Sequence, residues 1–177
     1  EGKTLKFIDN GIGMDADEVK KYIAQIAFSG AEEFLSKYTS NNEQDQIIGH
    51  FGLGFYSAYM VADLVEINTL SYKPGAEPVL WRCDGSSDYE LDRGTRETRG
   101  TEITLFVGKE HDDCLEQSHI EKILRHYCSF LPYPIFLNDK QINEKTPLWI
   151  KAPSECTQED YLQFYRSLYP MDEEPLF

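Results

Sequence analysis

Short stretches that alternate apolar and polar residues recur between glycine-containing turns, and this feature constrains the fold most. Residues 65–69, Val-Glu-Ile-Asn-Thr, alternate over the length of a strand. Further strand candidates lie at 79–83, 89–91 and 101–107, separated by turn pairs such as Asp84-Gly85. The run of strands predicts an antiparallel sheet with helices to one side, which is an α+β fold.

Residues 4–8 predict one more strand, with Leu5 and Phe7 on one face. A helix is expected over 16–27, because Asp15 and Glu18 have the spacing of a capping box and apolar residues follow at helical spacing. Other helices are predicted at 31–37, at 55–63 as a buried helix, and from Ser118 with Glu121 as its capping partner.

The sequence changes character toward its C-terminus. A last short strand is expected at 135–137, and the polar stretch 138–146 is typical of a linker. The residues from Trp149 onward are strongly acidic, with Thr157 capping a helix. We therefore expect a first domain over 1–138 and a linker with the start of a second domain over 139–177. Both ends look like cuts, so we expect a fragment of a longer polypeptide.

The charge balance narrows the classes of partner. With 17 Lys+Arg against 31 Asp+Glu, the net charge of −14 argues against a nucleic-acid-binding surface. No apolar run approaches the ~18 residues of a membrane-spanning helix. The four cysteines form no C-x-x-C pair, so a zinc site is not indicated and a reduced, cytoplasmic protein is expected.

Two glycine-rich stretches could hold a nucleotide. In Asp9-Asn10-Gly11-Ile12-Gly13-Met14 a strand would deliver a carboxylate into a cavity, where it could accept a hydrogen bond from the exocyclic amine of adenine. The two glycines would let the backbone pass close to a flat ligand. The alternative is a plain turn, because Asn-Gly is a hairpin signal, although a helix follows here instead of a second strand.

The second stretch, residues 49–55, runs into a predicted helix, and free N–H groups at a helix start favour phosphate. It lacks the preceding apolar strand of a Rossmann motif and the Lys of a Walker loop. The alternative is a glycine-permitted tight packing of helix on sheet. A third feature, Arg99-Gly100-Thr101 at the head of a strand, is by itself typical of a turn exit and gains meaning only if the first two stretches share a pocket.

The order of these motifs resembles that of the GHKL ATPase superfamily, whose fold is a two-layer α/β sandwich (the Bergerat fold). DNGIGM, IAFSGAEEF, GHFGLGFYSAYMVAD and GTEITLF together resemble the ninety-kilodalton heat-shock chaperones, in particular their bacterial HtpG type. The tail EDYLQFYRSLYPMDEEPLF resembles the start of that family's middle domain. The resemblance covers nearly the whole chain.

The resemblance implies a role for each motif in binding ATP or ADP. The adenine amine would be bound by Asp9, joined through ordered water by Gly13 and Thr101, with Met14 against the purine. Backbone N–H groups would reach the phosphates from Leu53, Gly54 and Phe55. Residues from about 28 to 55 would form a lid over the nucleotide, which agrees with their polar composition and candidate glycine hinges.

The sequence departs from the family pattern in two ways. Relatives often carry a polar residue and a Lys on the first helix, and the matching positions here are Tyr22 and Phe28. The family's acidic catalytic residue and its Mg²⁺-holding Asn lie on a helix upstream of residue 1, so the fold would be N-terminally truncated. The resemblance thus implies no catalytic residue and no metal ligand in this chain, which would be inactive in hydrolysis by itself.

The expected function is that of a fragment of an ATP-dependent molecular chaperone. Its partners would be unfolded or partly folded client proteins and a second copy in a homodimer, without nucleic acid or membrane. One alternative is a nucleotide-sensing or protein-interaction module of the same fold without turnover. A GHKL sensor kinase would be expected to lack the FYSAYMVAD helix.

Overall fold

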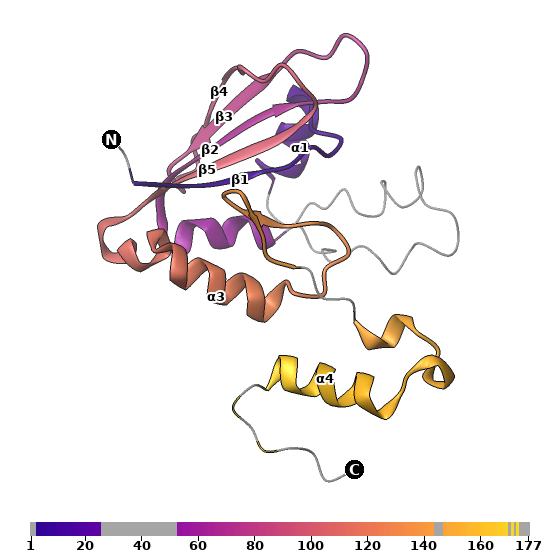
Figure 1. The fold of residues 1–177 in the computed structure, drawn as a ribbon. Coiled ribbons are helices and arrows are strands. Elements are labelled where there is room, and N and C mark those ends of the chain that lie inside the picture. Colours follow the sequence, from indigo (N-terminus) through magenta and orange to yellow (C-terminus); the bar gives the residue numbers. More distant parts are fainter. Residues whose placement is uncertain (1–2, 26–52, 144–146, 170, 172, 174–177) are drawn as a thin grey trace. The chain divides into compact units, whose positions relative to one another are not determined.

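The computed structural model describes residues 3–25, 53–143, 147–169, 171 and 173. The chain divides into two compact units, Glu1–Glu116 and Gln117–Phe177 (Figure 1). The predicted helix 31–37, most of the predicted lid, Phe28 and the first part of the second glycine-rich stretch lie outside the described residues. The domain boundary after residue 138 stays a prediction.

The first unit contains a five-stranded antiparallel sheet, as the alternating stretches predict (Figure 1). Its strands are β1 (Thr4–Ile8), β2 (Ala62–Leu70), β3 (Val79–Cys83), β4 (Glu90–Arg93) and β5 (Gly100–Val107), in the order β1-β5-β2-β3-β4. Since β1 pairs with β5, the stretch Asp9–Met14 after β1 is brought next to Gly100 and Thr101 at the start of β5.

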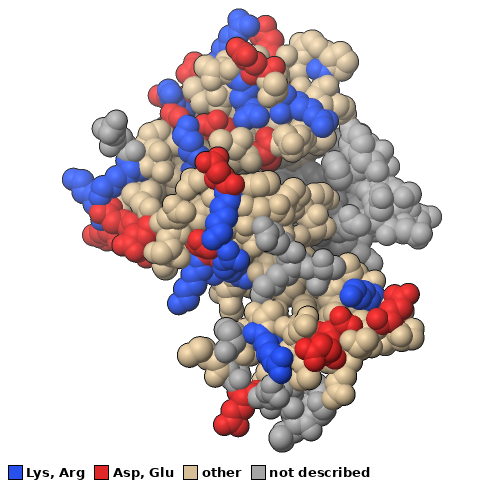
Figure 2. Space-filling view, viewed as in Figure 1, with Lys and Arg blue, Asp and Glu red and all other residues tan. Residues whose placement is uncertain are grey.

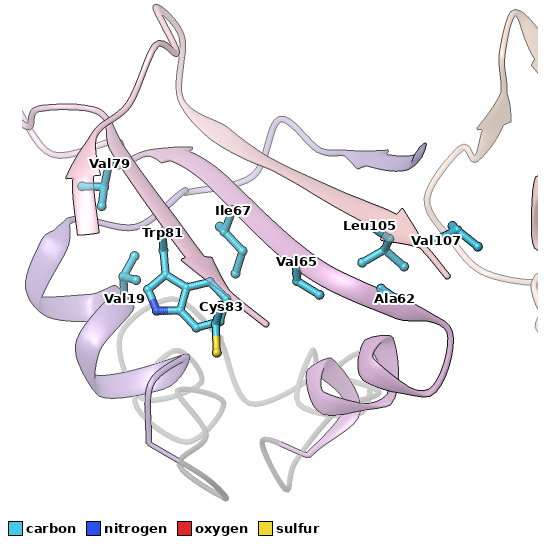
Figure 3. Packing of buried hydrophobic residues seen from close by; sticks show 9 residues of the cluster. All are labelled: Val19, Ala62, Val65, Ile67, Val79, Trp81, Cys83, Leu105 and Val107. Carbon is cyan, nitrogen blue, oxygen red and sulfur yellow. The ribbon is translucent and has the colours of Figure 1, made fainter. Parts of the chain in front are cut away.

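The two faces of this sheet differ sharply. Alternate residues of neighbouring strands, among them Val65, Ile67 and Trp81, form a buried cluster on one face (Figure 3). The opposite face carries charged cross-strand pairs such as Lys6 Nζ–Glu102 Oε1 at 2.7 Å. Figure 2 shows acidic and basic side chains interspersed on the visible face of the molecule. The sheet is therefore packed on one side and polar on the other, as expected for an α+β layer.

Helix α1 (Ala16–Tyr22) begins as predicted, with Asp15 and Glu18 forming a reciprocal capping box. It ends earlier than predicted, because Ile23 is its C-cap and residues 24 and 25 are no longer helical. The carbonyl of Ile23, which a longer helix would offer to its own backbone, accepts a hydrogen bond from the Tyr56 hydroxyl at 2.7 Å. A contact with a distant residue thus replaces the next helical turn.

The predicted buried helix 55–63 is wrong in type, extent and burial. The structure has a 3₁₀ helix, η2 (Gly54–Met60), with no fully buried residue, and Asp63 belongs to β2. Three aromatic side chains explain the difference. Phe55 packs edge-on against Trp81 at 5.7 Å between ring centroids, while the hydroxyls of Tyr56 and Tyr59 reach backbone carbonyls. A second 3₁₀ segment, η3 (Lys109–Leu115), follows β5.

The second unit begins with helix α3 (Gln117–Tyr127). Since Gln117 is already helical, the prediction that Ser118 caps this helix is wrong. Glu121 instead accepts hydrogen bonds from Arg125, one turn onward, and from Lys140. The Glu121 carboxylate therefore links α3 to Lys140 and does not cap the start of the helix.

The predicted linker at 138–146 is wrong for its described part, residues 138–143. Strands β6 (Phe136–Leu137) and β7 (Lys140–Gln141) form a hairpin, and Ile142 and Asn143 are buried. The Asn143 amide explains this order. It donates to the carbonyls of Leu131 and Tyr133, and its oxygen accepts from the Ile135 N–H at 2.6 Å.

Two short 3₁₀ segments, η4 (Leu148–Ile150) and η5 (Pro153–Glu155), precede helix α4 (Gln158–Leu168). Thr157 caps α4 as predicted, in a capping box with Asp160. The rings of Phe130, Trp149 and Phe164 pack together with centroids 5.0 to 6.0 Å apart. Among the described residues, no helix has the length and apolar character needed to cross a bilayer.

Candidate functional site

Asp9 and Thr101 meet where β1 ends and β5 begins. The Asp9 N–H donates to the Thr101 carbonyl at 2.8 Å. In return the Asp9 Oδ1 accepts from the N–H groups of Gly11 at 2.8 Å and Thr101 at 3.3 Å. Within the described part of the chain, Oδ2 has no hydrogen bond and Asp9 is exposed. The carboxylate is therefore held by backbone donors on one oxygen while the other can accept from a ligand.

Gly13 and Gly100 allow the backbone segments of this corner to interlock. Gly13 has φ +62°, and a Cβ there would lie 1.9 Å from the Leu70 carbonyl oxygen. Gly100 has φ +119°, and its Cβ would lie 2.2 Å from the Asp9 carbonyl oxygen. Both positions thus exclude any side chain, because the chain's own backbone occupies the space. We call Asp9, Gly13, Met14, Thr69 and Thr101 the Asp9 corner.

Thr69 joins this corner without having been singled out from the sequence. Its fully buried Oγ1 accepts from the Met14 N–H at 2.9 Å and lies 3.1 Å from the Thr101 Oγ1. The available signal is the alternation of the strand, which places Thr69 on the same face as Val65 and Ile67. A polar side chain at an otherwise apolar core position must have a partner.

The loop after β2 holds the other side of the Asp9–Met14 segment. The Tyr72 N–H donates to the Ile12 carbonyl at 2.7 Å, and Lys73 Nζ contacts Asp15 Oδ2 at 2.6 Å and Glu18 Oε1 at 2.9 Å. Burial opposes ionisation of Asp15, but hydrogen bonds from Lys73 and from backbone N–H groups outweigh it and hold the Asp15 pKa below its usual value. The same carboxylates raise the pKa of Lys73.

Leu53, Gly54 and Phe55 lie at the start of η2, which covers the same sheet face as α1 (Figure 3). Among the described residues, no hydrogen bond joins these three to the Asp9 corner. The link that the structure provides runs through α1, by the bond from the Tyr56 hydroxyl to the Ile23 carbonyl. The structure thus brings Asp9, Gly13, Met14 and Thr101 together, and places the predicted phosphate-binding residues on a neighbouring element.

Tyr22, which like Phe28 departs from the family pattern of the first helix, is half-buried at the end of α1. The Lys21 Nζ donates to the Tyr22 hydroxyl at 3.1 Å and lies 4.8 Å from the ring centroid. A cation is therefore present next to Tyr22, although Tyr22 itself supplies none.

Comparison with known proteins gives consistent matches. The model of the family described as Hsp90 protein matches residues 136–177. The chaperone protein htpG of Bacteroides fragilis is 50% identical, with 98% of this chain and 28% of the relative covered. HtpG of Porphyromonas gingivalis is 46% identical, with coverage of 99% and 28%. The mitochondrial TNF receptor-associated protein 1 homolog of Dictyostelium discoideum is 35% identical, with coverage of 95% and 24%.

The matches to the relatives extend over nearly every residue of the chain and define its class, that of the heat-shock chaperones. The chain belongs to the Hsp90 protein family, and within it to the bacterial HtpG type. It spans about 28% of the length of the HtpG relatives, so activities of the whole relatives come to it only as proposals.

Proposed function

We propose that this chain is the adenine-nucleotide-binding part of an ATP-dependent molecular chaperone. The observation that carries the proposal is the Asp9 corner, where a carboxylate is held by two backbone N–H groups with its second oxygen available. An exocyclic amine is a hydrogen-bond donor, so the base of ATP or ADP fits this acceptor. Gly13 and Thr101 would complete the base site through ordered water, and Met14 would pack on the purine.

The phosphates would lie toward η2. Backbone N–H groups at the start of a helix lack partners in their own helix and attract anions. We propose that Leu53, Gly54 and Phe55 supply these donors. ATP would bring Mg²⁺, which stabilises negative charge on the phosphates. The family's main Mg²⁺ ligand and its acidic catalytic residue match no position in this sequence.

At the level of the whole protein, we propose that ATP binding brings two copies together as a homodimer. Hydrolysis would use water as the nucleophile, with catalysis mainly by positioning and charge stabilisation. The clients would be unfolded or partly folded proteins of the cytoplasm. Suppression of client aggregation by the complete protein, dependent on ATP, is the measurement that tests this part.

The base site is tested by calorimetric titration of ATP with Mg²⁺ into the 177-residue chain and into Asp9→Asn. We expect Asp9→Asn to weaken binding at least about tenfold, the effect of losing one charge-assisted hydrogen bond. Asp17→Asn, an exposed change on α1, is the matched control and should leave affinity unchanged. A folded wild-type chain without nucleotide affinity would overturn the proposal, as would full affinity in Asp9→Asn.

The second candidate is a nucleotide-sensing or protein-interaction module without turnover. Tyr22 supports it, because relatives often place a polar residue that reaches the nucleotide at this position. Phosphate release by the complete protein separates the two candidates. Binding together with turnover supports the ATPase, whereas binding without turnover supports the module.

A further inference from the structure

We infer that Thr69 is a positioning residue that fixes the Asp9 corner around the adenine base. The inference rests on the proposed function and adds a residue that no motif in the sequence marks. Thr69 lies near the end of β2, which pairs with β5, and it stands directly opposite Thr101. Its side chain is fully buried, so it acts on a ligand only through its neighbours.

The contacts of Thr69 reach both halves of the corner. On one side its Oγ1 accepts from the Met14 N–H at 2.9 Å. On the other side it lies 3.2 Å from the Gly100 carbonyl oxygen and 3.1 Å from the Thr101 Oγ1. The Asp9–Met14 loop and the head of β5 belong to segments almost 90 residues apart in sequence. One hydroxyl therefore connects them on the core side of the sheet.

The number of hydrogens on this hydroxyl limits how Thr101 can meet a ligand. A threonine hydroxyl has one hydrogen and two acceptor lone pairs, and the Met14 N–H occupies one lone pair. If Thr69 donates to the Gly100 carbonyl, Thr101 donates to Thr69 and presents a lone pair to the base site. If Thr69 donates to Thr101, the Thr101 hydrogen is available instead. In both arrangements Thr69 fixes the orientation of the Thr101 hydroxyl.

Thr69→Val keeps the shape of the side chain and removes these contacts. The Met14 N–H and the Thr101 hydroxyl then lose a buried partner, and the loop relaxes away from β5. Because Asp9 is bound to the Thr101 N–H, its carboxylate shifts with that relaxation. A shift of the Asp9 carboxylate weakens its hydrogen bond to the adenine amine, while the contacts of the phosphates stay the same. Selectivity for adenine should therefore fall.

The experiment compares the dissociation constants of ATP and inosine triphosphate, which has a carbonyl where adenine has its amine. We expect Thr69→Val to reduce the preference for ATP about tenfold, as for one lost hydrogen bond. Thr69→Ser retains the hydroxyl and should keep the preference. Thr104→Val removes a buried hydroxyl from the opposite face of the same sheet and should leave the preference unchanged even if the chain becomes less stable. Equal weakening of both nucleotides in Thr69→Val would overturn the inference.

A second measurement needs no nucleotide. Hydrogen exchange of the Met14 amide should be about tenfold faster in Thr69→Val than in wild type, Thr69→Ser or Thr104→Val, because the amide loses its acceptor. Unchanged protection in Thr69→Val would overturn the inference whether or not ATP binds. If the Met14 amide exchanges as predicted in the variants but the wild-type chain binds no nucleotide, the role of Thr69 in the corner is supported and the proposed function is refuted. Thr69→Cys, with a weaker hydrogen-bonding group, replaces Thr69→Val if that variant does not fold.

Discussion

Gly13 is the residue on which the path of the Asp9–Met14 loop depends most. A Cβ there would overlap the Leu70 carbonyl, and its φ of +62° disfavours a side chain in addition. We expect Gly13→Ala to lower the free energy of unfolding by about 2 to 5 kcal/mol, as a left-handed alanine combined with overpacking. Urea unfolding followed by circular dichroism measures the loss.

Gly75→Ala is the matched control for Gly13→Ala. Gly75 has a similar φ of +76°, but an added Cβ would meet no atom within 4 Å. Its replacement should therefore cost only about 1 to 2 kcal/mol from the backbone conformation. Equal losses in the two variants would contradict the close approach of Gly13 to β2.

The residues of the corner differ in how far the sequence predicts them. The grouping of Asp9 and Gly13 follows from their shared loop, and the role of Thr101 was conditional on a shared pocket. The pairing of β1 with β5 brings Thr101 to Asp9, whereas the pocket shared with Leu53, Gly54 and Phe55 stays a prediction. The role of Thr69 could not be predicted. The alternation of the strand places Thr69 on the core face, but it does not show that the Met14 N–H lies within hydrogen-bond distance of its hydroxyl. Whether these residues bind a nucleotide stays a prediction.

The start of helix α1 is predicted to depend on pH through Asp15. Its pKa is lower in the folded chain than in the unfolded chain, since Lys73 and backbone N–H groups favour the ionised form over the opposing effect of burial. Such a group stabilises the fold above its unfolded pKa, and the stabilisation is lost as the pH falls through the folded pKa. Wild type should therefore exceed Asp15→Asn in stability at pH 7, and the difference should shrink as the pH falls below the unfolded pKa of about 3.9.

Lys73→Met supplies the control for this pH dependence. It leaves Asp15 in place and removes the cation that contacts it, so the folded-state pKa of Asp15 should rise and the stabilisation that Asp15 gives at pH 7 should become smaller. Unfolding free energies measured from pH 7 to about pH 2 test both variants. A pH profile that is the same in wild type, Asp15→Asn and Lys73→Met would refute the assignment.

Strands were predicted more accurately than helices, and the reason is physical. Alternation over 65–69 and 79–83 reports a sheet with one buried face, which is what the structure has. Helix ends depend on contacts that lie far away in sequence. Tyr56 takes the carbonyl that would continue α1, and Asn143 orders a stretch whose composition resembles a linker. Local patterns contain no information on such partners.

The two compact units each contain one of the two tryptophans, so they can be followed separately. Trp81 is almost fully buried in the first unit, whereas Trp149 is two-thirds exposed in the second. In the Trp149→Phe background, Trp81 is the remaining fluorescent tryptophan and reports on the first unit. Adding Ile67→Ala there should lower the midpoint of unfolding, because the cavity it creates reduces the free energy of unfolding by about 2 to 5 kcal/mol. The midpoint seen in Trp81→Phe, where Trp149 reports, should not move. Coincident shifts at both probes would show that the units unfold as one.

The pairing of β1 with β5 also sets the order of events during synthesis. Thr4 lies opposite Phe106 and Ile8 opposite Glu102. About a hundred residues must therefore be synthesised after β1 before its partner strand exists. Contacts this distant in sequence close large loops and form slowly. A nascent chain that has left the ribosome only as far as β4 contains Asp9 and Gly13 but not Thr101. The base site therefore forms late. Until β5 has been synthesised, β1 has no partner strand, and its unpaired backbone groups are open to pairing with other chains.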